Sequence, residues 1–176
     1  MERKYNYPGE LSTEEAFGAN RKEYFKYKGE QDIDKFFAYL KSENYPMAGA
    51  SEKEILDLIS EFPNLPKNYI KFLENCGRGV EFYRGDDYHV KEVKELLSDA
   101  NFLLYTENDF QGVVPETAFV FWMHGGYQFA FFELEKGDNS PIYFYNEGED
   151  SSCFRKVAEN FTEFIIKSFN ANSPRE

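Results

Sequence analysis

Apolar residues recur with helical spacing in four segments of the chain. Ile33, Phe36, Phe37 and Leu40 stand at i, i+3, i+4 and i+7, which predicts an amphipathic helix at about 32–41. The same spacing predicts further helices at 51–62, 66–77 and 160–169. Each of these helices would bury one face and leave the other in water.

The predicted helix starts carry residues that suit unpaired backbone N–H groups. Ser51 and Glu54 form an S-x-x-E capping box, in which the two residues satisfy each other's N–H groups. Pro66 suits the first turn of the next helix, where its missing N–H would have no partner. Asn160 can cap the last helix, with Glu163 at the third helical position.

Three aromatic-rich runs between Val114 and Gly148 are separated by turn signals and predict an antiparallel meander. Gly125-Gly126 supplies the positive φ angles that a tight hairpin turn requires. The predicted strands are 119–124, 127–134 and 142–146. In the first strand, period-two alternation places Phe119, Phe121 and Met123 opposite Val120, Trp122 and His124.

Both faces of this meander are unusually apolar for an antiparallel sheet. One face should therefore belong to the core. The other should meet helices, another chain or a partner, because large contiguous apolar patches are uncommon on monomers.

The order of elements predicts an α+β fold, in which N-terminal helices precede a mainly antiparallel β-sheet and a C-terminal helix closes the domain. Between the helices and the meander, 80–83 is expected to be a strand, 88–90 a second strand or strand end, and 91–98 a short helix. Residues 101–106 are expected to lead into the loop before Val113. Residues 1–50 read as an extension with one helix, and 51–176 as the main domain.

The charge balance restricts the kinds of partner. The chain has 20 basic and 32 acidic residues and a net charge of −12. Residues 1–30 contain six of each sign, so the excess lies in the rest of the chain. Such a surface repels phosphate backbones and anionic membranes, which argues against direct binding of nucleic acid or membrane. A basic partner would be attracted, although acidity also serves solubility alone.

Other features argue against a membrane protein and against an enzyme. No apolar run has the length of a membrane span, and the first residues lack a secretory signal, so a cytoplasmic location is expected. Cys76 and Cys153 have no ligand-spaced neighbours, so neither a metal nor another cofactor is expected. No G-x-S-x-G elbow or P-loop is present, and Gly77-Arg78-Gly79 lacks the third glycine of a dinucleotide fingerprint, since Phe82 stands there.

Two acidic loops are the candidate contact sites for a partner. Each combines carboxylates with turn residues that would expose them to solvent. The candidate residues are Asp86, Asp87, Tyr88, Glu147, Glu149 and Asp150. The alternative for each is an ordinary solvated loop. His124 is expected to fix the hairpin turn by a hydrogen bond, and Trp122 to lie in the core.

Several segments in order along the chain resemble the SMI1/KNR4 family, also called the SUKH superfamily. The sequence LPKNYIKFL, followed by Cys76-Gly77, is similar to the entry motif of that family. The later HGGYQF, PIY and FTEFI segments agree in order and spacing, so the resemblance covers about 51–169. Residues 86–109 depart most from the family pattern and lack its usual Trp.

The resemblance implies a small α+β domain that binds a protein. Bacterial members are largely immunity proteins, which neutralise a cognate toxin, often a nuclease or deaminase, without catalysis. Fungal members act in cell-wall signalling. The first hypothesis is therefore an immunity protein whose partner is a toxin with a basic surface. The alternative is a regulatory or interaction scaffold, in which the second sheet face mediates self-association into a homo-oligomer or binds another protein.

Overall fold

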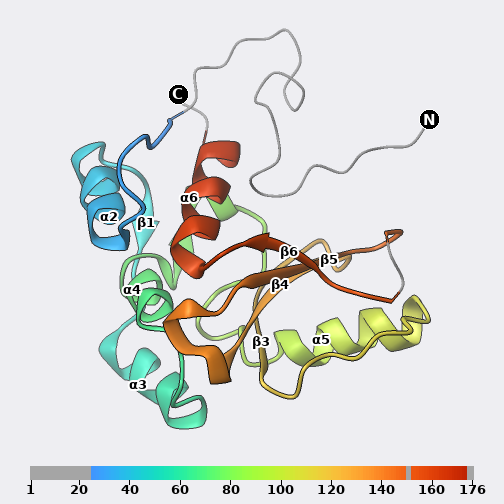
Figure 1. Ribbon diagram of the computed structural model, residues 1–176. Coiled ribbons are helices and arrows are strands. Elements are labelled where there is room, and N and C mark those ends of the chain that lie inside the picture. Colours follow the sequence, from blue (N-terminus) through green and yellow to red (C-terminus); the bar gives the residue numbers. More distant parts are fainter. Residues whose placement is uncertain (1–24, 150–151, 174–176) are drawn as a thin grey trace, which may run out of the picture.

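The computed structural model describes residues 25–149 and 152–173 and shows an α+β fold (Figure 1). Helices α2 (Ile33–Ser42), α3 (Glu52–Glu61) and α4 (Lys67–Cys76) precede the main sheet, and α6 (Phe161–Asn172) follows it. A two-stranded sheet pairs β1 (Met47–Ala48) with β2 (Gly79–Val80). The predicted fold class and the order of elements are confirmed.

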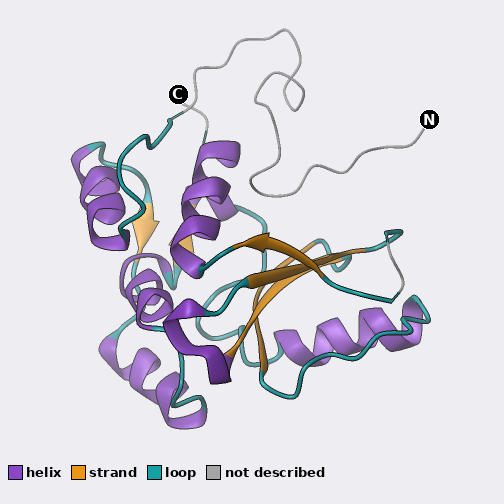
Figure 2. Cartoon of the chain, viewed as in Figure 1, coloured by secondary structure: helices purple, strands orange, loops and turns teal. Residues whose placement is uncertain are grey.

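The main sheet is an antiparallel meander of four consecutive strands, drawn in orange in Figure 2. They are β3 (Ala118–His124), β4 (Gln128–Glu133), β5 (Ile142–Asn146) and β6 (Arg155–Ala158). Gly125 and Gly126 adopt φ angles of 57° and 76° in the first turn, as the sequence predicts. The strand β6 adds to the three strands expected from the sequence.

The helix starts follow the predicted capping chemistry. Ser51 and Glu54 form both hydrogen bonds of the capping box, and the Asn160 side chain accepts from the Glu163 N–H. The Asp32 side chain caps α2 by accepting from the Lys35 N–H. Local sequence therefore accounts for the starts of these three helices.

The prediction of regular alternation along β3 was wrong, because the strand contains a bulge. Val120 pairs with Phe131 and Trp122 pairs with Ala130, so Phe121 is an extra residue in the ladder. Phe121 contacts the Phe132 ring on the side that faces α6. Trp122 and His124 are therefore shifted to this side, and Met123 to the opposite side.

The helices α4 and α6 cover one face of the sheet through aromatic contacts. Tyr69 of α4 packs against Phe119 and Phe132, with ring centroids 5.5 and 5.4 Å apart. Phe161 of α6 packs against Phe121 at 5.2 Å, and Phe164 is fully buried beside it. Burial of these large rings supplies much of the apolar driving force for folding.

The second face is covered by the chain between the small sheet and β3. Helix α5 (Leu96–Phe102) continues into the π-helical turn η2 (Leu103–Glu107) and lies beside β3, away from α6 (Figure 1). Phe110 then packs against Tyr145 and Phe154, at 5.8 and 4.9 Å. The sequence left helices, another chain or a partner open for this face, and the structure shows that the protein's own chain covers it.

The segment before the meander differs from its prediction. The expected strand at 80–83 is the end of β2 followed by the 3-10 helix η1 (Glu81–Tyr83). In place of a strand at 88–90 there is a single bridge between Asp87 and Met123. The helix expected at 91–98 begins at Leu96 and runs to Glu107, through residues expected to lead into a loop. Apolar burial decides this, since Leu96, Ala100, Leu103 and Leu104 all face the core.

Residues 25–48 pack onto the same core as the rest of the chain. Phe36 of α2 contacts Phe169 of α6 at 5.4 Å, and Tyr27 packs on Phe36 at 5.3 Å. The Phe25 N–H donates to the Ser173 carbonyl. Residues 1–24 of the predicted extension lie outside the described residues. No helix in the described ranges combines the length and apolar character needed to cross a membrane.

Candidate functional site: an acidic pocket beside the first hairpin

A surface pocket of about 580 Å³ lies between α5–η2 and the β3–β4 hairpin. Four carboxylates and two aromatic rings contribute to its lining, and we call it the acidic pocket. These residues are Asp87, Asp99, Glu107, Glu147, Phe102 and Tyr127. The pocket brings together one residue from each predicted acidic loop, although the two loops are about 60 positions apart in the sequence.

Backbone hydrogen bonds hold both predicted acids at the pocket. Asp87 and Met123 exchange two N–H···O bonds of 2.8 Å, which attach the Asp87 backbone to the edge of β3. The Glu147 N–H donates to the Tyr127 carbonyl at 3.0 Å, which attaches the end of β5 to the hairpin turn. The positions of these two residues are therefore set by the sheet itself.

No basic side chain of the described residues lines the acidic pocket. None of its four carboxylates forms an ion pair with any residue in the described ranges. The ion pairs that the described residues form involve other acidic side chains, for example Glu61 with Lys94. The pocket therefore concentrates negative charge that no basic side chain of the described residues neutralises.

Asp86 lies under the hairpin, and its side chain is only 10% exposed. Its carboxylate accepts a hydrogen bond from Trp122 Nε1 at 2.8 Å and shares one of 2.6 Å with His124 Nδ1. Burial raises the pKa of Asp86, and the hydrogen bonds from His124 and Trp122 oppose this shift. The prediction that Asp86 presents its carboxylate to a partner is therefore corrected, because the carboxylate is occupied inside the protein.

The bulge in β3 brings together the two side chains that hydrogen-bond to Asp86, those of Trp122 and His124. It places Trp122 and His124 on the same side of the strand, where their rings stack with an interplanar angle of 9°. Tyr127 packs edge-on against His124, with centroids 5.4 Å apart. The side-chain hydrogen bond of His124 thus joins the hairpin to Asp86 and does not lie within the turn as expected, whereas Trp122 is buried, as expected.

The other predicted contact residues lie apart from the acidic pocket. Tyr88 is 7% exposed, and its hydroxyl accepts from the Val80 N–H at 2.7 Å, so it is a core residue and its placement on an accessible loop was wrong. Glu149 is exposed and lines a neighbouring pocket together with Arg155; burial raises its pKa, and Arg155 opposes this. Asp150 lies outside the described residues.

Sequence reasoning missed the contribution of α5–η2 to the pocket. Asp99, Phe102 and Glu107 were assigned no role, because the helix was expected to end at residue 98. The spacing of Leu96, Ala100, Leu103 and Leu104, at i, i+4, i+7 and i+8, was the signal that could have extended the helix and exposed these three side chains.

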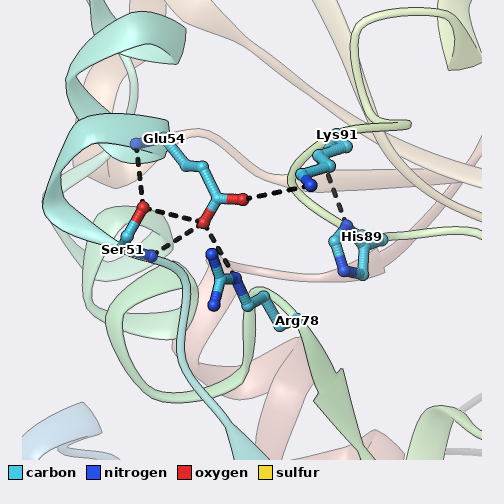
Figure 3. A network of polar contacts seen from close by, with 5 residues as sticks. All are labelled: Ser51, Glu54, Arg78, His89 and Lys91. Atoms are coloured by element: carbon cyan, nitrogen blue, oxygen red, sulfur yellow. Dashed lines mark hydrogen bonds and ion pairs between the residues drawn. The ribbon is translucent and has the colours of Figure 1, made fainter.

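A second polar network fixes the start of the segment that leads to α5 (Figure 3). The Glu54 carboxylate accepts from the Ser51 N–H at 2.8 Å and from Arg78 Nε at 2.9 Å, and Lys91 Nζ lies 3.8 Å away. The Lys91 N–H donates to His89 Nδ1 at 3.2 Å. The capping box of α3 therefore also holds Arg78, and Lys91 of the chain after Asp87 lies within ion-pair distance of it.

The acidic pocket presents carboxylates and aromatic rings side by side. Its carboxylates can accept hydrogen bonds from lysine or arginine side chains, and its two rings can pack against their aliphatic parts. No group of three or more His, Cys, Asp or Glu in the described ranges is arranged to hold a metal ion.

We predict that Asp86→Ala and Asp87→Ala differ sharply in stability. Asp86→Ala leaves the Trp122 N–H without its acceptor and should lower the free energy of unfolding by about 1–3 kcal/mol. Asp87→Ala removes an exposed side chain and should change it by less than about 0.5 kcal/mol. Urea unfolding of both variants measures the difference; equal losses would contradict the structural role of Asp86.

We predict an acid-dependent contribution from Glu54. Hydrogen bonds from the Ser51 N–H and from Arg78 lower the pKa of Glu54 to about 2. Because the folded pKa is depressed, the stabilisation is present above the unfolded value of 4.5 and is lost as the pH falls toward 2. Glu54→Gln should therefore be less stable than the unaltered protein at about pH 7, and the gap should narrow below about pH 5 in urea unfolding. A gap that stays constant with pH would argue against this assignment.

Comparison with known proteins places the chain in a family. The model of the SMI1 / KNR4 family (SUKH-1) matches residues 49–167, from just before α3 into α6. No curated protein and no solved structure matches the chain. The match covers the three predicted landmarks: the α4 segment, the hairpin and the closing helix. The chain therefore belongs to the SMI1/KNR4 (SUKH-1) family.

Proposed function

We propose that this protein is a bacterial immunity protein, which binds a cognate toxin in the cytoplasm and neutralises it without catalysis. The observation that carries the proposal is the acidic pocket, which is lined by Asp87, Glu147, Asp99 and Glu107 and by no basic side chain among residues 25–149 and 152–173. The family is known for immunity-type domains, and membership is consistent with a protein partner. The toxin is identified here only by its chemistry, as a protein with an exposed basic surface.

A nuclease is the kind of toxin that this pocket fits best. A groove built to hold phosphate groups presents lysine and arginine side chains, and these would be attracted to the unpaired carboxylates. Complementary fields can raise an association rate from about 10⁵–10⁶ to about 10⁸–10⁹ M⁻¹s⁻¹ at low salt. Fast association suits an immunity protein, because the toxin must be blocked before it acts.

The regulatory or self-associating scaffold has less support from the fold. That alternative relied on an apolar second sheet face left open for another protein. Phe129 and Phe131 on this face are buried by at least 99% and pack against Phe154, while α5 lies against β3 on the same face. Association through that face would require the covering segment to leave.

We predict that reversing the charge of the pocket slows association with the toxin. The probe is an inactive form of a toxin domain, identified first by finding a toxin gene next to the gene of this protein, and binding is followed by surface plasmon resonance at low and high salt. Asp87→Lys with Glu147→Lys should lower the association rate at least about tenfold at low salt and weaken its salt dependence. Asp57→Lys, at an exposed acid on α3, is the control and should have little effect; the single variants Asp87→Lys and Glu147→Lys are compared with it at an equal change of net charge.

Two results would contradict the proposal. Failure of the unaltered protein to bind the toxin domain, or to protect cells that express the active toxin, would argue against the immunity function. Equal effects of the pocket variant and of Asp57→Lys would argue against the acidic pocket as the site that attracts the partner.

A further inference from the structure

We propose that an apolar ridge beside the acidic pocket anchors the partner, and that the partner therefore combines basic side chains with an apolar recess. The ridge consists of Phe102, Tyr105 and Val113. This inference rests on the proposed function and adds to it the second chemical property of the partner surface. The acidic pocket would govern the encounter, and the ridge would govern how long the complex lasts.

Exposure singles out this ridge among the described residues. The large hydrophobic residues that they leave exposed are Leu56, Phe102, Tyr105 and Val113, and three of these four belong to the ridge. Phe102 is 56% exposed and also lines the acidic pocket, so the ridge and the charged site adjoin. Exposed apolar groups that gather next to a polar rim mark interaction sites on soluble proteins.

Contacts within the protein hold Tyr105 and the loop that carries Val113 before any partner arrives. The Tyr105 hydroxyl donates to the Gly112 carbonyl at 3.3 Å and accepts from the Val114 N–H at 3.2 Å, which ties the loop carrying Val113 to η2. The Tyr105 ring also packs against buried Phe110, with centroids 6.1 Å apart. A rigid aromatic surface loses little conformational entropy on binding, which favours a long-lived complex.

The segment around η2 faces both the core and the solvent. Leu103 and Leu104 are 2% and 0% exposed and pack into the core, while Phe102 and Tyr105 on either side point to solvent. The Asn108 side chain donates to the Leu103 carbonyl at 3.0 Å, and the Phe110 N–H donates to the Leu104 carbonyl at 2.8 Å. Single π-turns of this kind are frequent at functional sites.

The negative charge beside the ridge indicates which kind of partner binds there. A second copy bound about a twofold axis would bring the acidic pocket against its own equivalent, and like charges across an interface are costly. Nucleic acid and anionic membranes are repelled by the net charge of −12. A protein that presents lysine or arginine beside an apolar recess satisfies both the pocket and the ridge.

The experiment compares Phe102→Ala with Leu56→Ala, using the same inactive toxin domain as the probe. The two side chains are 56% and 57% exposed, and Leu56 lies on α3, away from the acidic pocket. Phe102→Ala should raise the dissociation rate at least about tenfold, as for an aromatic hot spot, and leave the salt dependence of association unchanged. Leu56→Ala should dissociate like the unaltered protein. Val113→Ser provides a second ridge variant and should also dissociate faster, and thermal melts of all variants verify folding.

The possible results separate this inference from the proposed function. If the unaltered protein binds but Phe102→Ala and Val113→Ser dissociate as slowly as Leu56→Ala, the ridge inference is overturned and the immunity function stands. If the ridge variants dissociate faster but the pocket variant associates normally, the ridge stands and steering by the pocket fails. If the unaltered protein does not bind, both are overturned. A concentration-dependent dimer that Phe102→Ala abolishes in light scattering would overturn the chosen occupant in favour of a second copy.

Discussion

The burial of a sheet that is apolar on both faces is the constraint on which the rest of this structure depends. Helices α4 and α6 cover one face through Tyr69, Phe161 and Phe164. The opposite face needs a second cover, and the chain supplies it with α5–η2 and Phe110. Because this cover crosses the surface beside the first hairpin, its outward side chains and the hairpin together enclose the acidic pocket. The proposed site is thus a consequence of how the second face is buried.

The hydrogen bonds of Asp86 link the cover to the hairpin. Its carboxylate binds Trp122 and His124, which the bulge in β3 brings to the same side of the strand. The next residue, Asp87, then pairs with the edge of β3 through its backbone and exposes its own carboxylate at the pocket. Two adjacent aspartates therefore have different roles. One is held under the hairpin and sets the geometry, and the other is available to a partner.

Local sequence was sufficient where the deciding interactions were local. The Ser51–Glu54 capping box, the Asn160 cap and the Gly125-Gly126 turn each depend on residues a few positions apart, and all three were predicted. The β3 bulge was not, because period-two alternation carries no sign of an extra residue. The burial of Asp86 and Tyr88 depends on Trp122 and Val80, and an acidic loop in the sequence looks the same whether its side chains turn inward or outward. The placement of Asp87 and Glu147 at the same pocket depends on the register of the sheet, which could not be predicted from the sequence.

Amide hydrogen exchange of the protein, free and bound to the inactive toxin domain, is the most direct test of the central claim that the cover of the second sheet face is also the partner surface. Our account predicts that the toxin slows exchange in residues 99–107, in the hairpin turn at Gly125–Tyr127 and around Glu147. Helices α2 and α3 should exchange as in the free protein. Slower exchange confined to α2 or α3, with no change at α5–η2 and the hairpin turn, would contradict the account.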